Sequence, residues 1–402
     1  MRSLREAEPV VPHIVVLAPA ANGPSVPGAA APVYFRPMIG WALAAAAGLP
    51  RGAIGVSGPA SEAELADALR GFPGVRSYGS QASPRDAARA AAAAESAKRD
   101  VLVLDGARVL LAPADLETLL VRHAAGISLC TFLSSPDGSP AGAWCFRREA
   151  LDADGELPCE PVALRDPEGA LAITGLDSLA AAERLLQDRL NGELLRRGVL
   201  LADPRTTRVD PACRLAPGSV IEGGCDLVNT SIAAGARVEA FCRLTNADIG
   251  EESVVRLSSI VESSRLGKGC RVGPFATVAG SKLDDEASAG SYAELMNTTL
   301  GRGTQAGGHS YLWNCTVGQD VEIGRGFLST GPGDARQTVI EDDAFIGAAC
   351  HVVAAVTVGR GAFIATGTSI TDDAPAGSFV ISRGRQVVKT GHARSHAPRR
   401  RP

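Results

Sequence analysis

One aliphatic or alanine position recurs at a short, nearly constant interval across residues 209–370, and this repeat limits the possible folds more than any other feature. The steps between successive positions run 6, 6 and 5 residues and then start again, so that three steps make 17 residues. Neither the period of an α-helix nor the alternation of a simple strand gives this spacing. Such a hexapeptide repeat predicts a parallel β-helix, a three-sided prism with one buried anchor on each side of each coil. The anchors include Leu266, Val272, Val278, Leu283, Ala289, Leu295, Leu300, Ala306, Leu312, Val317 and Ile323.

The residues around the anchors are small. An anchor is often followed by glycine, as at Gly267, Gly301 and Gly324. A chain that turns about every six residues needs a residue tolerant of positive φ at each corner, so we expect these glycines to form the corners. Two positions before an anchor the residue is usually alanine, as at Ala276 and Ala293, which predicts that both positions point into a narrow core.

The overall composition sets broad limits. At 402 residues the chain has room for two or three domains, and its net charge of −4 gives no reason to expect nucleic-acid binding. No apolar run reaches the length of a membrane span, and residues 1–8 carry charges of both signs without a following hydrophobic segment. Nine cysteines are scattered singly, which favours reduced thiols over a zinc site. We therefore expect a cytoplasmic protein with no membrane partner.

The first 150 residues alternate apolar strands with alanine-rich helical segments. Strands are predicted at 13–18, 53–57, 100–104, 127–133 and 143–146, and helices at 38–49, 61–69, 84–99 and 113–124. This alternation predicts a mostly parallel sheet that is covered on both faces. Ligands of such sheets bind beyond the carboxyl ends of the strands, here after Ala18 and Leu104. Leucines at helical spacing over 177–198 then predict a connecting helix, capped by Asp177 or Ser178.

An α/β domain, a connecting helix and a hexapeptide prism, in that order, resemble the bifunctional N-acetylglucosamine-1-phosphate uridyltransferase/glucosamine-1-phosphate acetyltransferase family. The resemblance is carried by Val272-Gly-Pro-Phe-Ala, Gly290-Ser-Tyr-Ala-Glu-Leu-Met-Asn, Ala306-Gly-Gly-His-Ser-Tyr-Leu and Ile340-Glu-Asp-Asp-Ala-Phe-Ile-Gly. It implies a shortened nucleotidyltransferase-like α/β (Rossmann-like) domain over 1–175, a linker helix over 176–201, a left-handed parallel β-helix over 202–377 and a basic tail over 378–402. It also implies a homotrimer with acyl-CoA sites in clefts between neighbouring prisms.

The nucleotidyltransferase motifs of this family are incomplete here. The family's glycine-rich loop carries an arginine and a lysine that offset nucleotide phosphates, whereas this chain has no arginine between Ala18 and Tyr34. The family's metal-binding residues match Asp105, displaced by two positions, and Asp177, and these carboxylates suit Mg²⁺. Their alternative roles are a strand-end turn and a helix cap. We expect no uridyl transfer.

The acetyltransferase motifs are also altered. The family's catalytic base is the histidine of Ala-Gly-His, but aligning Leu312 with its anchor places Gly308 at that position and moves the histidine to His309. His309 can act as the base only if the corner of the prism adjusts, because neighbouring residues of a strand face opposite sides. Tyr311 is retained and could orient the acceptor, or it could pack between subunits.

The contacts to the sugar phosphate are mostly lost. Ala279 and Met296 replace the family's arginine and lysine, and each lost charge-assisted hydrogen bond costs about 1.5–3 kcal/mol. This argues against glucosamine 1-phosphate as substrate. Arg383 matches an arginine near the family's acyl-CoA site, although a surface ion pair would explain it equally well.

Three functional hypotheses follow. The first is a transferase that moves an acyl group from acetyl-CoA or another acyl-CoA to an amino sugar or sugar phosphate, with His309 as base and an inactive nucleotidyltransferase domain. The second is a non-catalytic trimeric scaffold or regulatory partner, because both sites lose charged residues while the repeat stays regular. The third is a Mg²⁺-dependent sugar-1-phosphate nucleotidyltransferase that uses Asp105 and Asp177.

Overall fold

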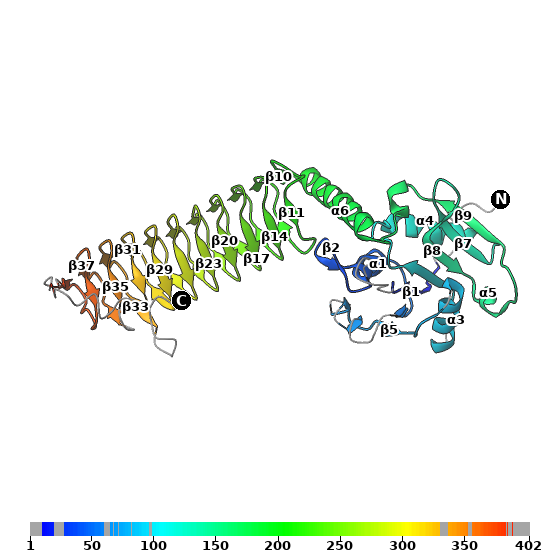
Figure 1. Ribbon diagram of the computed structural model, residues 1–402, viewed down its shortest axis with the longest axis horizontal. Coiled ribbons are helices and arrows are strands. Elements are labelled where there is room, and N and C mark those ends of the chain that lie inside the picture. Colours follow the sequence, from blue (N-terminus) through cyan, green and yellow to red (C-terminus); the bar gives the residue numbers. More distant parts are fainter. Residues whose placement is uncertain are drawn as a thin grey trace, which may run out of the picture. The chain divides into compact units, whose positions relative to one another are not determined.

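The computed structural model describes residues 10–19, 28–59, 65–66, 68–70, 72–81, 83–95, 99–329, 337–352, 356–382, 384 and 388. The chain forms two compact units, Met1–Arg189 and Leu190–Pro402, and the boundary falls within one long helix. Figure 1 shows the elements of both units. No helix in the described ranges is long and apolar enough to cross a membrane.

The first unit is built on a seven-stranded sheet with the order β5-β4-β1-β6-β8-β7-β9. The strands are β1 (His13–Leu17), β4 (Ile54–Ser57), β5 (Arg76–Ser77), β6 (Val101–Asp105), β7 (Cys130–Ser134), β8 (Pro140–Phe146) and β9 (Cys159–Ala163). The helices are α1 (Met38–Ala47), α3 (Pro84–Ala94), α4 (Pro113–Ala125), α5 (Arg148–Asp152) and the 3-10 helix η1 (Pro167–Ala170), and β2 (Pro32–Val33) and β3 (Arg36–Pro37) form a separate hairpin. Strand β8 runs antiparallel to both neighbours, and the other pairs are parallel.

Helices cover both faces of this sheet, as predicted. Along β1, Ile14 and Val16 belong to a core cluster that α1 and α4 complete, whereas Val15 belongs to a second cluster formed with α3 and α5. This alternation is what a strand that is buried on both faces requires. The predicted strands near residues 13, 53, 100 and 143 are confirmed, and β7 begins at Cys130, later than expected. The helix predicted at 61–69 lies largely outside the described residues.

Helix α6 (Leu176–Arg196) is the predicted connecting helix. At its start the hydroxyl of Ser178 accepts hydrogen bonds from the N–H groups of Thr174 and Gly175, both at 3.0 Å. Near its end the buried amide of Asn191 donates to the carbonyls of Pro204 (2.7 Å) and Thr207 (2.9 Å). These two bonds fix the last turns of the helix to the loop that opens the prism.

The second unit is a left-handed parallel β-helix whose coils stack along one axis (Figure 1). Face 1 consists of β10 (Leu200–Leu201), β13 (Val220–Ile221), β16 (Arg237–Val238), β19 (Val254–Val255), β22 (Arg271–Val272), β25 (Ser288–Ala289), β28 (Gln305–Ala306), β31 (Glu322–Ile323), β34 (Phe345–Ile346), β37 (Phe363–Ile364) and β39 (Phe379–Val380). Face 2 consists of β11 (Arg208–Val209), β14 (Asp226–Val228), β17 (Arg243–Thr245), β20 (Ile260–Glu262), β23 (Thr277–Ala279), β26 (Glu294–Met296), β29 (Tyr311–Trp313), β32 (Leu328–Ser329), β35 (His351–Val352) and β38 (Ser369–Ile370). Face 3 consists of β12 (Arg214–Leu215), β15 (Ser231–Ile232), β18 (Asp248–Ile249), β21 (Arg265–Leu266), β24 (Lys282–Leu283), β27 (Thr299–Leu300), β30 (Cys315–Val317), β33 (Thr338–Ile340) and β36 (Thr357–Val358).

The predicted anchors form the core of the prism. All eleven anchors named above are 2% exposed or less, and the alanines two positions earlier, such as Ala276 and Ala293, are equally buried. Cysteines occupy the same small inward positions, including Cys242 and Cys270. The 17-residue period therefore reports the stacking of side chains in register between successive coils.

Glycines that directly follow an anchor were predicted to form corners with positive φ. In the described repeat this prediction is wrong for all of these glycines except Gly273. Only Gly273 has a positive φ there (96°), and the left-handed residues lie two or three positions after the anchor instead. The glycines are needed for close approach between coils. A Cβ on Gly301 would lie 2.4 Å from the carbonyl oxygen of Gly318, and one on Gly324 would lie 2.5 Å from the nitrogen of Ala348.

Candidate active site at a corner of the prism

His309 lies at the corner between faces 1 and 2, three residues after the anchor Ala306. Its backbone is left-handed (φ 57°). Tyr292, one coil earlier, and Phe275, two coils earlier, occupy the same corner and are also left-handed. The three rings form a stacked column, with centroid distances of 5.0 Å between Phe275 and Tyr292 and 4.9 Å between Tyr292 and His309. A left-handed conformation is costly for a bulky residue, but it recurs at other corners, as at Glu252, so it belongs to the fold and does not mark His309 as special.

The two glycines before His309 lie close against neighbouring coils. A Cβ on Gly308 would lie 2.8 Å from the carbonyl oxygen of Ser291, and one on Gly307 would lie 2.7 Å from the nitrogen of Arg325. Neither position has room for a side chain without movement of the backbone. The next residue, His309, is exposed, so this corner presents an imidazole to solvent.

Tyr311 lies two residues after His309, at the start of β29 on face 2. It points outward, is half-buried, and pairs in register with Glu294 on one side and Leu328 on the other. The next residue of this outward column is His351, whose Nε2 lies 2.8 Å from the hydroxyl oxygen of Ser369. The corner imidazole therefore stands beside a column that carries a carboxylate, a phenol and apolar side chains.

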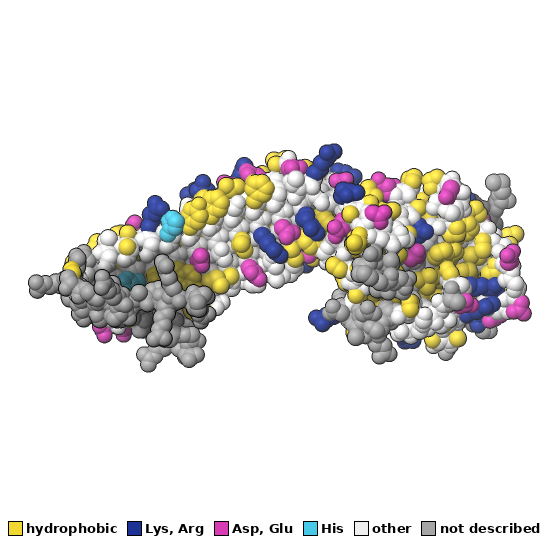
Figure 2. All heavy atoms as spheres, in the orientation of Figure 1, with side chains coloured by type: hydrophobic (Ala, Val, Ile, Leu, Met, Phe, Trp, Pro, Cys, Tyr) yellow, Lys and Arg dark blue, Asp and Glu magenta, His cyan; other side chains and the backbone are white. Residues whose placement is uncertain are grey.

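Large apolar side chains are exposed around this corner. Phe241, Phe275 and Tyr292 on the corner and Leu328 and Trp313 on face 2 keep between 39% and 67% of their surface exposed. Figure 2 shows hydrophobic side chains gathered along an edge of this unit, with a histidine beside them. A contiguous apolar surface of this kind on a regular face is typical of a contact with another protein chain.

The two predicted metal ligands lie at the end of a strand and in the first turn of a helix. Asp105 ends β6, where its Oδ1 accepts a hydrogen bond from the N–H of Ala107 (3.0 Å) and its Oδ2 lies 3.4 Å from Nε of Arg108. Asp177 is exposed in the first turn of α6. In the described ranges no group of three or more histidines, cysteines or acidic residues could hold a metal ion. The contacts of Asp105 are those of a strand-end turn, and a Mg²⁺ site at Asp105 and Asp177 stays a prediction.

The predicted acyl-CoA contact, Arg383, lies outside the described residues. A contact between Arg383 and acyl-CoA therefore remains a prediction from the resemblance.

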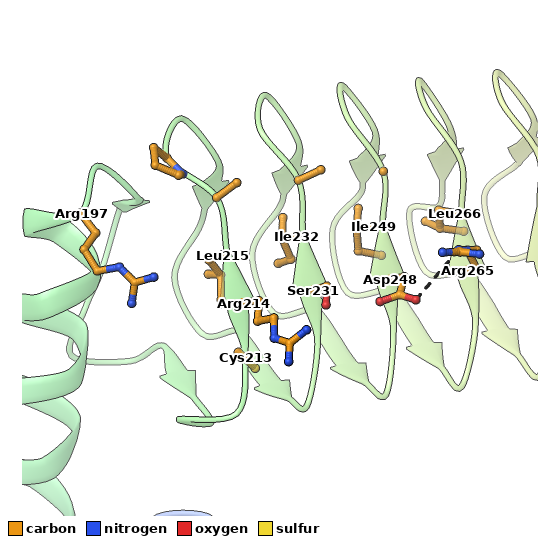
Figure 3. A pocket seen from close by; sticks show the side chains of 14 residues that line it. Arg197, Cys213, Arg214, Leu215, Ser231, Ile232, Asp248, Ile249, Arg265 and Leu266 are labelled. Carbon is orange, nitrogen blue, oxygen red and sulfur yellow. Dashed lines mark ion pairs between the residues drawn. The ribbon is translucent and has the colours of Figure 1, made fainter. Parts of the chain in front are cut away.

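A hollow that the sequence did not predict lies on face 3 near the start of the prism. This cavity of about 600 Å³ is lined by Arg197, just after α6, and by the first strands of face 3. In Figure 3, Arg214 points along the coils toward Ser231, and a dashed line marks the ion pair between Asp248 and Arg265, at 4.0 Å. Three arginines and one carboxylate line the cavity, so it favours an anionic or polar ligand. It shares no residue with the His309 corner.

A signal for this cavity was present in the sequence. Arg214, Ser231, Asp248 and Arg265 each precede an anchor and are spaced by 17 residues, which places them in one outward column. The contribution of Arg197 was not predictable, because it requires the end of α6 to meet the first coils.

The α/β unit, the connecting helix and the parallel β-helix follow one another in the order that the resemblance predicts. No family model matches the chain. A segment is 46% identical over 76 residues to the bifunctional protein GlmU of Bordetella petrii, covering 18% of this chain and 17% of that relative. A segment of 58 residues is 55% identical to GlmU of Bordetella parapertussis, covering 14% of this chain and 13% of that relative. The resemblance to this bifunctional family is thus confirmed over less than a fifth of the length of these relatives.

Among solved structures, the chain is similar to the Arabidopsis UDP-N-acetylglucosamine acyltransferase. The sequence identity is 17%, the TM-score is 0.30, and the match covers 42% of this chain and 69% of that chain.

Proposed function

We propose that the chain is an acyl-CoA-dependent acyltransferase that acts on an amino-sugar-type acceptor at the His309 corner. The observation that carries this proposal is an exposed imidazole at the corner of a complete prism, within the segment Ala306-Gly-Gly-His-Ser-Tyr-Leu. As the amine nitrogen attacks the thioester carbon, His309 takes the proton that the nitrogen loses. The C–S bond then breaks and the thiol of CoA leaves with a proton. Tyr311, next to the corner, orients the acceptor.

The site is completed by further copies of the chain in a homotrimer. The exposed apolar surface of Phe241, Phe275, Leu328 and Trp313 supports this part of the proposal, because assembly would bury it. A cleft between two prisms would also exclude water from the thioester. Sedimentation of the purified protein at micromolar concentration should give the mass of three chains, and a monomer would contradict the proposal.

Acyl transfer is tested by incubating the protein with acetyl-CoA and a panel of amino sugars and following the release of free thiol. His309→Ala should lower kcat/KM by about 10²–10⁴, the usual contribution of a general base. His351→Ala is the matched control, because His351 is bonded to Ser369 on the same unit and has no catalytic role in the proposal. Turnover that is equally insensitive to both changes would exclude His309 as the base.

A non-catalytic trimeric scaffold or regulatory partner is the second candidate function. One observation favours it: in the described part of the chain the imidazole of His309 has no side-chain hydrogen bond, and its ring stacks on Tyr292. A general base is normally oriented by a further polar group. Under this alternative the protein forms a trimer and releases no thiol with any acceptor, and saturable turnover would contradict it.

The Mg²⁺-dependent nucleotidyltransferase ranks third because Asp105 is already engaged by Ala107 and Arg108. Calorimetry with Mg²⁺ and a nucleoside triphosphate tests it, and we expect no binding heat.

A further inference from the structure

Two cysteines of the first unit lie directly opposite each other on neighbouring parallel strands. Cys130 begins β7, Cys159 begins β9, and the register of the two strands makes them Cα partners. Adjacent strands are about 4.8 Å apart, which is within the roughly 4.4–6.8 Å Cα separation of disulfides. The thiol of Cys159 donates a hydrogen bond to the carbonyl of Leu157 (3.4 Å). The register thus brings the backbones of the two cysteines to the Cα separation found in disulfides.

The two thiols differ in access to solvent. Cys159 is the exposed one among the nine cysteines, whereas Cys130 is 1% exposed and lies in the core cluster between the sheet and α3. A dissolved oxidant therefore reaches Cys159 first. Cys145, on the neighbouring β8, belongs to the cluster on the opposite face of the sheet. Cys225 and Cys242 occupy successive coils of the prism, but both are buried.

A cation lies on α3, the helix that packs against the cluster containing Cys130. Arg85, in the first turn of α3, donates from its terminal nitrogens to the carbonyls of Ala150 (2.8 Å), Ala153 (2.6 Å) and Gly155 (2.6 Å). Its buried Nε has no hydrogen-bond partner in the described part of the chain. Burial raises the pKa of the Cys130 thiol, and the charge of Arg85 opposes that rise. A guanidinium in this position would stabilise a Cys130 thiolate.

We propose that Cys130 and Cys159 are a reversible oxidative modification site, forming an intramolecular disulfide by exchange with a small disulfide such as oxidised glutathione. The thiolate of Cys159 attacks one sulfur, an S–S bond breaks, and one glutathione leaves. The thiolate of Cys130 then attacks the sulfur of Cys159 and releases the second glutathione. The protein loses two protons and two electrons, and oxidised glutathione is reduced to two thiols. The bond fastens the edge strand β9 to β7. This site does not depend on the proposed acyl transfer.

The test uses the full chain, reduced and then exposed to oxidised glutathione, with intact mass and peptide mapping under non-reducing conditions. We expect the loss of the mass of two hydrogens and one cross-linked peptide pair that contains Cys130 and Cys159. Cys130→Ser should stop at a mixed disulfide and gain the mass of one glutathione less two hydrogens, and Cys159→Ser should form neither the cross-link nor the mixed disulfide. Wild-type protein that stops at the mixed disulfide, or a cross-link to Cys145, would overturn the proposal.

The role of Arg85 has its own matched control. Arg89 holds the same segment, donating to the carbonyls of Leu151 (2.7 Å) and Ala153 (2.9 Å). Arg85→Met should slow the conversion of mixed disulfide to cross-link several-fold, and Arg89→Met should leave that rate unchanged. If both variants slow it equally, anchoring of the segment is what matters, and the assigned effect of Arg85 on the thiolate is wrong.

Discussion

Replacing Gly301 by alanine should destabilise the prism, because no space for a side chain exists between the two coils that meet there. The new Cβ would lie 2.4 Å from the carbonyl oxygen of Gly318 and 2.5 Å from its carbonyl carbon. Ordinary van der Waals contact begins near 3.4 Å, so the coils would have to separate by about 1 Å. That movement would stretch the hydrogen bond from the N–H of Gly301 to the carbonyl of Val317, now 2.8 Å, beyond bonding distance.

The size of the effect follows from these two losses. Overpacking costs about 1–3 kcal/mol and a lost backbone hydrogen bond about 0.5–1.5 kcal/mol, so Gly301→Ala should lower the free energy of unfolding by about 2–4 kcal/mol. Gly192→Ala is the control, since a Cβ on this glycine of α6 meets nothing within 4 Å. That change should raise the free energy of unfolding by about 0.5–1 kcal/mol. Urea unfolding measures both, and a Gly301→Ala protein as stable as wild type would refute the close-approach explanation.

Three further predictions concern individual side chains. Asn191→Ala should cost about 1–3 kcal/mol in urea unfolding, because it removes the hydrogen bonds of the buried amide to the carbonyls of Pro204 and Thr207; a neutral result would mean that water replaces the amide. Tyr292→Ala removes ring contacts on both sides of the column and should cost about 1–2 kcal/mol, whereas Tyr292→Phe should be near neutral. Burial lowers the pKa of His13 from 6.5, and its Nδ1 accepts from the N–H of Ala53 (3.0 Å), so stability should be complete above pH 6.5 and fall as the pH drops below it. His13→Asn, which keeps an acceptor but does not titrate, should flatten this dependence in thermal unfolding between about pH 7 and 5, and an unchanged slope would assign it to other groups.

The prism was predictable because its period is a direct consequence of stacking. Each coil places its anchors above those of the previous coil, so burial imposes the same residue type every 17 positions, as from Leu266 to Leu283 to Leu300. The role of the glycines was not predictable in the same way. A glycine in the sequence signals either positive φ or a close approach, and only the register between coils, such as the contact of Gly301 with Gly318, decides between them.

The elements of the first unit that escaped prediction are short or polar. Strand β9 contains Glu160 and Pro161 and lies at the edge of the sheet, where neither full burial nor strict alternation is required. The pairing of Cys130 with Cys159 was hidden for a different reason. Strand β9 joins β7 although β8 lies between them in the sequence, so spacing along the chain carries no information about that contact.

The candidate site was partly predictable. The sequence placed His309 near a corner and Tyr311 just before an anchor, and both positions follow from the repeat. It could not decide whether a side chain fits at Gly308, because that depends on the distance to Ser291 in the previous coil. The reading of Asp105 as a strand-end residue also needed the contact with Ala107.

The most direct measurement is an experimental structure of the assembled protein with acetyl-CoA bound. We predict that the thioester lies in a cleft between two copies of the prism, with its carbonyl carbon next to the imidazole of His309. Cofactor bound elsewhere on the chain, with the ring of His309 still stacked on Tyr292 and remote from it, would contradict acyl transfer at this corner.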